Sequence, residues 1–302
     1  MKKISYILYV LALATSCQNF SKSTNSQRNI ASEEYQAQIK ADKKRQAELD
    51  LPFRGFSEDK NLQVIAFSSG INSEPPEPLW TTIEKNNPEL MLVCSTPTPL
   101  KSLSKTSEYR AIREKVPFMA TWYNYNTSKK FETKADFIKN WPYAKNMITA
   151  NQDGFYHSKF FGTKKNLIHI IMSDLSDTRS QEAQWAWLEN ELKQPAAIKV
   201  LACGPEQREK LLALIKKTKA KNLILIPNNQ PVQNFEKTEI KDFGPIYEAT
   251  ANTADFSPVR SVSSAETPLN FGLIKINWNE RVAQLEIRSV DNQKMQSLDL
   301  KF

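Results

Sequence analysis

Short apolar runs alternate with amphipathic segments along the chain from about residue 61 onward. The apolar runs read LQVIAF, ELMLVC, VPFMAT, LIHIIM, IKVLA and NLILI, and their length and branched residues predict buried strands. Between them lie EPLWTTIEKN, KTSEYRAIREK, QEAQWAWLENEL and EQREKLLALIKKTKA, which predict helices. Near the end of the chain, FGLIKINW and AQLEIRS each alternate apolar and polar residues, and together they predict a hairpin. This order predicts an α/β fold in which helices cover mixed sheets.

Residues 1–17 show a different pattern, a basic MKK followed by ISYILYVLALA and then LATSC. The apolar run is too short to span a bilayer comfortably and is typical of a secretory signal. The small residues before Cys17 resemble a bacterial lipoprotein signal, in which the cysteine is lipidated and becomes the mature N-terminus. The alternative is an ordinary signal peptide that contains a cysteine. The residue after Cys17 is Gln18 and not an aspartate, so the resemblance favours the outer membrane. We therefore expect a lipid-anchored protein of the bacterial cell envelope.

Residues 18–60 are polar and contain few aliphatic side chains. QNFSKSTNSQRN has the composition of a linker, and ASEEYQAQIKADKKRQAELD has helical propensity without a clear apolar stripe. We therefore expect a polar tether that includes a solvated helix. The predicted organisation is a signal peptide at 1–17, the tether at 18–60 and an α/β domain at 61–302.

The net charge of +8 raises the question of an anionic partner. The longest basic runs, KADKKR and KKTKAKN, have no interleaved aromatic residues of the kind that stack on nucleic-acid bases. We interpret them as solvated faces and expect no nucleic-acid partner. The chain also has only 7 glycines, and it contains neither a Walker loop nor a dinucleotide fingerprint.

The order of the segments resembles the alkaline phosphatase D, or PhoD-like, metallophosphatase family. QWAWLENEL is similar to the family's Gln-x-x-Trp-Leu helix, and DGFYHSKFFG, REKLLALI and NFGLIKINW fit the same series. The resemblance runs from about residue 62 to the C-terminus and does not include the family's common N-terminal β-domain. It implies an αββα sandwich of the metallophosphatase type, with a metal site at the strand ends and phosphatase or phosphodiesterase activity.

The family's metal-ligand motifs are altered wherever the resemblance locates them. SSG stands in place of Gly-Ser-Cys, STP in place of Gly-Asp-Asn, WYNYN in place of Trp-Asp-Asp-His-Asp, and PNNQP in place of Ser-Gly-Asp-x-His. The vestigial site positions are Ser68, Gly70, Thr96, Tyr123, Asn124, Tyr125, Asn126, Asn228, Asn229 and Pro231.

These replacements remove the charge that a metal centre needs. A dinuclear phosphatase site holds two cations about 4 Å apart and requires several carboxylates, with imidazoles to complete the shells. Asparagine offers only a neutral carbonyl oxygen, and tyrosine is a neutral phenol at pH 7. We therefore expect no metal or other cofactor. The aromatic side chains Trp122, Tyr123 and Tyr125 either plug the former cavity or line an apolar cleft for a neutral ligand.

The remaining polar candidates are few. Of the two histidines, His169 lies inside LIHIIM and is expected to be a core residue, while His157 in FYHSKFF is expected at a strand edge, with a ligand role as the minor alternative. Neither a Gly-x-Ser-x-Gly elbow nor a Cys/His signature accompanies them. In SDLSDTRSQ, which contains Asp174 and Asp177, Arg179 is a candidate anion contact, since the family carries a comparable Asp-x-Arg there. The alternative is an Asp–Arg pair that fixes the loop.

Cys94 and Cys203 end the runs ELMLVC and IKVLAC. They are either two buried small hydrophobes or, in an oxidising periplasm, a disulfide.

Two functions follow from these residues. The first is a membrane-anchored pseudophosphatase that binds an unknown protein or small-molecule partner. The second is a metal-dependent phosphodiesterase or alkaline phosphatase-type hydrolase whose ligands have moved, and only this one requires a divalent metal.

Overall fold

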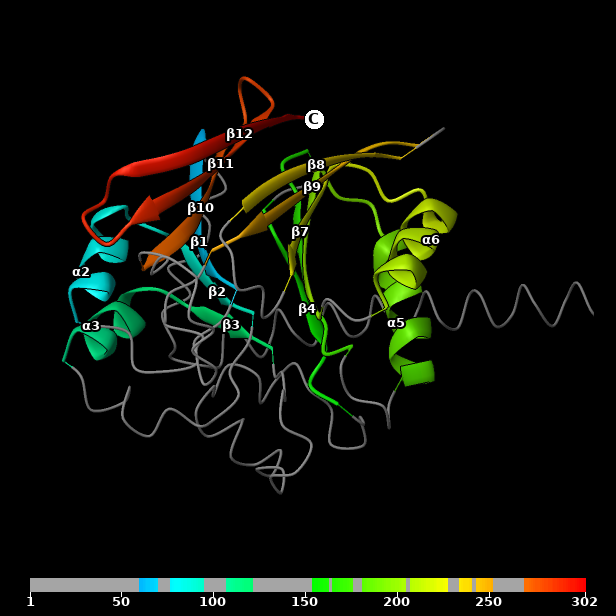
Figure 1. Ribbon diagram of the computed structural model, residues 1–302, viewed down its shortest axis with the longest axis horizontal. Helices are drawn as coiled ribbons and strands as arrows, with labels where there is room; N and C mark the ends of the chain where they lie inside the picture. Colours follow the sequence, from blue (N-terminus) through cyan, green and yellow to red (C-terminus); the bar gives the residue numbers. More distant parts are fainter. Residues whose placement is uncertain are drawn as a thin grey trace, which may run out of the picture. The chain divides into compact units, whose positions relative to one another are not determined.

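Two six-stranded sheets form the centre of the fold in the computed structural model (Figure 1). The structure describes residues 60–69, 77–94, 107–121, 154–162, 165–175, 181–204, 207–227, 234–240, 243–251 and 269–302. Both sheets are mixed. In the first sheet, parallel strands form one half and antiparallel strands the other, whereas in the second sheet four parallel strands are flanked by an antiparallel strand at each edge. No helix in these ranges is long and apolar enough to cross a membrane.

The first sheet has the order β12-β11-β10-β1-β2-β3. Its strands are β1 (Leu62–Ser68), β2 (Leu90–Val93), β3 (Phe118–Ala120), β10 (Asn270–Asn277), β11 (Val282–Ser289) and β12 (Lys294–Lys301). β1, β2 and β3 are parallel because α2 (Glu77–Lys85) and α3 (Ser107–Lys115) follow β1 and β2 and return the chain to the same end. The hairpin predicted near the C-terminus is confirmed as β10 and β11, and β12 extends it.

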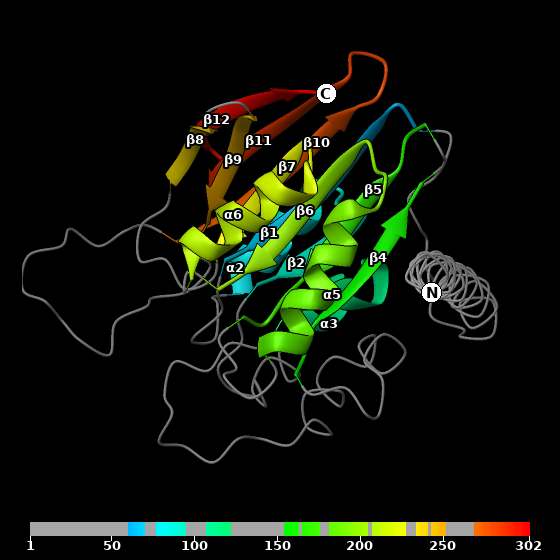
Figure 2. The same ribbon diagram turned by 90° about the vertical axis from the view of Figure 1, so that its right-hand side faces the viewer.

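The second sheet has the order β4-β5-β6-β7-β9-β8. Its strands are β4 (His157–Phe161), β5 (Ile168–Met172), β6 (Ile198–Cys203), β7 (Leu223–Pro227), β8 (Asn234–Ile240) and β9 (Gly244–Thr250). α5 (Gln181–Lys193) connects β5 to β6, and α6 (Arg208–Thr218) connects β6 to β7. Figure 2 shows both helices lying over β5, β6 and β7. The predicted helices and interior strands are confirmed here, whereas β8 and β9 were not predicted.

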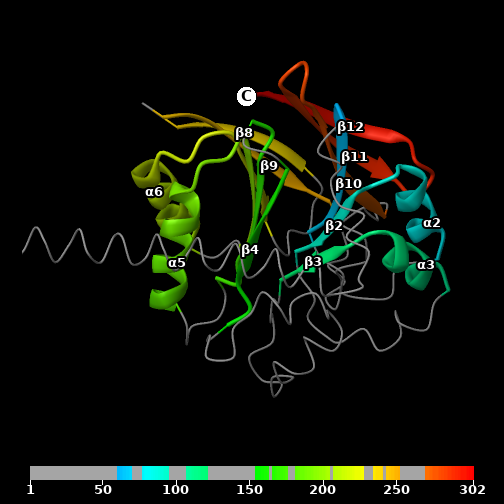
Figure 3. The same cartoon turned by 180° about the vertical axis from the view of Figure 1, so that it is seen from behind.

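Three apolar clusters define the layers. The largest lies between the sheets and contains inner-face residues of both, such as Ile65 and Leu92 from the first and Val200 and Ile224 from the second. A second cluster packs α2 and α3 against the outer face of the first sheet, and a third packs α5 and α6 against the outer face of the second. The two helix pairs therefore lie on opposite sides of the paired sheets (Figure 3), in the layer order helix, sheet, sheet, helix.

The inner cluster contains one very close approach of a side chain to a backbone. Gly272 on β10 pairs with Phe67 on β1, and a Cβ atom at Gly272 would lie 2.0 Å from the Phe67 ring. The ring packs directly on the glycine backbone, so a larger residue there would displace Phe67 from the core.

Candidate functional site

The carboxyl ends of the parallel strands of both sheets meet at one edge of the fold. Open α/β sheets usually bind their ligands at such an edge. Five polar residues that follow or end these strands are fully or almost fully buried: Ser68, Ser69, Thr121, Ser173 and Asp174. We call this group the strand-end edge.

Hydroxyl groups at the strand-end edge are used in structural hydrogen bonds. The Ser69 N–H donates to the Ala251 carbonyl at 2.7 Å, and the Ala251 N–H donates to Ser69 Oγ at 3.0 Å. These two bonds join the end of β1 to the end of β9 and therefore tie the two sheets together. The Thr121 hydroxyl donates to the Cys94 carbonyl at 2.9 Å, which joins the ends of β2 and β3. The edge is a hydrogen-bonded joint between strands.

His157 also belongs to this edge. It begins β4, which runs antiparallel to β5, and strand alternation places it on the inner face with Phe161. Burial lowers the pKa of His157 to about 4, while the Phe155 backbone acts weakly in the opposite direction. His157 is therefore a neutral imidazole at pH 7, on the edge strand that the sequence predicted.

Most of the predicted site positions cannot be compared with this edge. Ser68 is described, and it is fully buried at the end of β1. The other vestigial positions, together with Cys17, Asp177 and Arg179, lie outside the described residues. Within the described ranges, no group of three or more His, Cys, Asp or Glu residues could hold a metal ion. Asp174 and His157 are the metal-ligand types that the described strand-end edge offers.

His169 occupies a separate buried cluster beneath α5. Its Nε2 lies 2.9 Å from Glu191 Oε2, the same oxygen that accepts a hydrogen bond from the Ser158 hydroxyl at 2.7 Å. The ring stacks on Phe160 with 3.9 Å between centroids. Burial lowers the pKa of His169, Lys199 adds to this effect, and Glu191 opposes it. The predicted core role of His169 is confirmed. The Ser158 hydroxyl donates to Glu191 and not to the imidazole, so the cluster lacks the nucleophile–base arrangement of a hydrolase.

Cys94 and Cys203 are both buried, and no disulfide joins them. Cys94 belongs to the cluster between the sheets, whereas Cys203 belongs to the cluster beneath α5 and α6, so their side chains lie on opposite faces of the second sheet. Burial raises the pKa of the Cys94 thiol well above its ordinary value. The structure thus confirms the interpretation of Cys94 and Cys203 as small buried hydrophobes rather than a disulfide.

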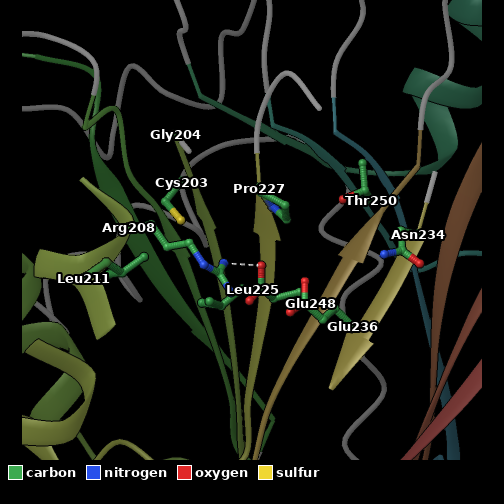
Figure 4. A pocket seen from close by; sticks show the side chains of 10 residues that line it. All are labelled: Cys203, Gly204, Arg208, Leu211, Leu225, Pro227, Asn234, Glu236, Glu248 and Thr250. Carbon is green, nitrogen blue, oxygen red and sulfur yellow. Dashed lines mark hydrogen bonds and ion pairs between the residues drawn. The ribbon is translucent and has the colours of Figure 1, made fainter. Parts of the chain in front are cut away.

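A cavity of about 360 Å³ lies on the outer face of the second sheet, beside the start of α6 (Figure 4). We call it the α6 pocket. Its walls come from α6, from the carboxyl-terminal parts of β6, β7 and β9, and from the amino-terminal part of β8. The lining residues are Cys203, Gly204, Arg208, Leu211, Leu225, Pro227, Asn234, Glu236, Glu248 and Thr250.

An ion pair crosses the α6 pocket. Arg208 Nη1 lies 2.5 Å from Glu248 Oε2, and this contact is the main cause of the raised pKa of Arg208, with Glu236 adding to it. Glu248 is only 7% exposed, and its other oxygen, Oε1, is buried with no hydrogen-bond partner among the described residues. Glu236 faces Glu248 directly across the β8–β9 pair. The pocket therefore contains two carboxylates and one guanidinium.

The local structure of α6 explains why Arg208 lies where it does. Arg208 is the first helical residue, and the preceding Gln207 has φ 60° and ψ 31° and makes no side-chain cap bond with the described residues. A cation at a helix N-terminus is unfavourable because it meets the positive end of the helix dipole. The Glu248 carboxylate offsets this repulsion. Sequence reasoning missed the pocket, although Glu248 inside the apolar stretch IYEAT was a usable signal.

Comparisons with known proteins give a limited result. No protein-family model matches the chain, and no curated protein matches it either. A predicted phosphoesterase from Streptococcus pneumoniae is similar over 80% of this chain and 98% of its own, with a TM-score of 0.39 and 8% identity. Vps29 from Chaetomium thermophilum is similar over 79% of this chain and 98% of its own, with a TM-score of 0.42 and 10% identity. A phosphatase from Mycoplasma pneumoniae is similar over 80% of this chain and 93% of its own, with a TM-score of 0.42 and 10% identity. Likenesses this weak establish neither a shared family nor a shared activity.

Proposed function

We propose that this chain is a lipid-anchored protein of the bacterial cell envelope that has a PhoD-like, metallophosphatase-type αββα fold and acts by binding rather than by hydrolysis. Its partner is a protein or a small molecule. The single observation that carries the proposal is the chemistry of the strand-end edge, where the Ser69 and Thr121 hydroxyls bond to backbone and Asp174 is the buried carboxylate among the described residues.

The argument from the strand-end edge is one of charge. A two-metal phosphatase site needs several carboxylates to offset the repulsion between its cations. The described part of the edge contributes one carboxylate and one imidazole, Asp174 and His157, and these two groups alone cannot supply that charge. In addition, the Ser69 and Thr121 hydroxyls are already committed to hydrogen bonds that join strands. The altered motifs in the sequence agree with this chemistry, because they contribute no further carboxylate or imidazole at the vestigial positions.

The test of the proposal is hydrolysis of a generic phosphodiester and a generic phosphomonoester by the purified full-length protein. Each substrate is offered with Ca²⁺, Mn²⁺, Fe²⁺, Zn²⁺ and Mg²⁺ in turn, beside a chelator control. We expect no turnover above the rate of a heat-denatured sample. Turnover that the chelator abolishes would overturn the proposal in favour of a hydrolase with relocated ligands.

A pair of variants identifies the ligands if turnover does appear. Asp174→Asn removes the buried carboxylate of the strand-end edge, and Asp299→Asn removes an exposed carboxylate on β12 that accepts a hydrogen bond from the Gln284 amide. A relocated metal site at the edge requires that only Asp174→Asn abolishes turnover.

The anchor has a separate test. We expect Cys17→Ser to move the protein from the membrane fraction to the soluble fraction, because an acyl anchor holds a protein through its buried methylene groups. Unchanged membrane association would argue against lipidation of Cys17 and would leave the hydrolysis result unaffected.

A further inference from the structure

We propose that the α6 pocket is a binding site for a small organic cation that carries a primary ammonium group next to an apolar moiety. The pocket lies on the outer face of the second sheet, at the carboxyl ends of β6, β7 and β9, and therefore borders the strand-end edge. The residues that carry the inference, Arg208, Glu236 and Glu248, take no part in the argument against hydrolysis, so the two proposals can be tested separately.

The charge of the lining favours a cation. Glu236 and Glu248 are direct cross-strand neighbours, and like charges in that position repel each other. Among the described residues that line the pocket, Arg208 is the only cationic side chain, so this part of the lining carries one more negative than positive charge. An anionic ligand would meet both carboxylates, and Arg208 is already engaged by Glu248.

Glu248 shows where the cation binds. Its side chain is more than nine-tenths buried, Oε2 is paired with Arg208, and Oε1 is buried without a donor among the described residues. A buried acceptor without a partner is costly, and a ligand that donates to it removes that cost. An ammonium group has three N–H donors, which suits a site with Glu248 Oε1 on one side and the Glu236 carboxylate on the other.

The rest of the pocket fits an organic ammonium better than a metal ion. Leu211, Leu225 and Pro227 give the cavity an apolar wall that can hold a hydrocarbon group (Figure 4). A cavity of about 360 Å³ is large enough for a molecule with one ring. A bare divalent cation would lie next to the Arg208 guanidinium and would find only two carboxylates among the lining residues.

Calorimetric titration of the purified full-length protein with benzylamine tests the proposal. Benzyl alcohol has nearly the same shape without the charge, and benzoate places the opposite charge on the same ring. We expect benzylamine to bind in the millimolar range or tighter and both controls to bind at least about tenfold more weakly, as expected for hydrogen bonds to charged groups.

Four variants localise the binding. We expect Glu248→Gln to weaken benzylamine binding by about tenfold, and Glu236→Gln by about threefold because Glu236 is exposed and screened by water. Glu236→Gln is on the surface and should fold even if Glu248→Gln does not. Arg208→Gln should strengthen binding, because it frees the whole Glu248 carboxylate for the ligand. Glu280→Gln, an exposed change in the turn after β10, is the matched control and should have no effect.

Two results would overturn the proposal. One is the absence of benzylamine binding at millimolar concentration, or equal binding of benzylamine and benzyl alcohol. The other is binding that neither glutamate variant weakens, which would place the amine elsewhere on the protein. Neither result would bear on the phosphoesterase assay.

Discussion

The strand-end edge and the α6 pocket differ in whether their buried polar groups have hydrogen-bond partners among the described residues. At the edge, the Ser69 and Thr121 hydroxyls bond to the backbone of neighbouring strands. In the pocket, Glu248 keeps one buried oxygen without a donor among the described residues. A satisfied polar group holds structure together, whereas an unsatisfied one beside a cavity calls for a ligand. Both regions lie at the carboxyl ends of parallel strands, so the comparison teaches that charge and cavity, and not this position alone, locate the better binding candidate.

Acidification should produce the largest effect, and it acts through the strand-end edge. The pKa of His157 is about 4 in the folded protein and 6.5 ordinarily. Between pH 4 and pH 6.5, His157 is therefore protonated in the unfolded chain and neutral in the folded protein. The stabilisation is complete above pH 6.5 and falls by about 3 kcal/mol as the pH drops to 4.

Urea unfolding at several pH values from 7 to 4.5 measures this dependence. His157→Leu fills a similar volume without a titrating group, so its free energy of unfolding should fall less steeply with pH. His169 is retained in both proteins, and its pKa is also lowered, so the difference between the two curves isolates His157. Identical slopes would mean that the pKa of His157 is the same in the folded and unfolded states, which would contradict the predicted effect of burial.

The α6 pocket should respond asymmetrically to loss of either member of its ion pair. Arg208→Gln leaves a buried carboxylate without a counter-ion and should cost about 2 kcal/mol, a value reduced from that of a fully buried pair because Arg208 is 42% exposed. Glu248→Gln leaves an arginine that reaches water and should cost about 1 kcal/mol or less. Unfolding in urea at neutral pH compares the two.

Benzylamine sharpens that experiment. It should restore part of the stability lost in Arg208→Gln, because a ligand that binds only the folded state stabilises it. A larger cost for Glu248→Gln than for Arg208→Gln would show that the carboxylate is not the member of the pair that burial penalises.

The smallest of these effects concerns the joint between the sheets. Ser69→Ala removes the acceptor of the buried Ala251 N–H and should cost about 1 kcal/mol of unfolding free energy. Ser289→Ala removes a similar bond, from the Gln293 N–H, in an exposed turn and should cost far less because water replaces the hydroxyl. Equal costs would contradict the structural role of Ser69. Neither variant should alter benzylamine binding.

The sequence predicted the parts of the fold that are apolar enough to be recognised locally. β1, β5, β6 and β7 are continuous apolar runs, and helices such as α5 lie between them. β8 was missed because NFEKTEI is polar and largely solvent-exposed, and β9 because it begins with Gly-Pro, which usually marks a turn. β12 was missed because only Leu300 of its eight residues is buried.

The α6 pocket could not be assembled from the sequence because its charged residues come from separate elements. Arg208 and Glu248 are 40 positions apart in the chain, and their contact depends on β9 pairing with β7 rather than with β8 alone. The histidines were easier, since a strand-like run around His169 is enough to predict a core position. The altered motifs predicted the loss of metal ligands, and this stays a prediction because every vestigial position except Ser68 lies outside the described residues.

β8 has a consequence for solubility as well as for the pocket. It is the last strand of its sheet, and an edge strand exposes backbone groups on which a second chain can polymerise. Its exposed residues include Glu236, Lys237 and Glu239, and the last two form an ion pair at 2.8 Å. An added strand would have to strip water from these charges. The strand that supplies Glu236 to the α6 pocket therefore also protects the protein against edge-to-edge aggregation.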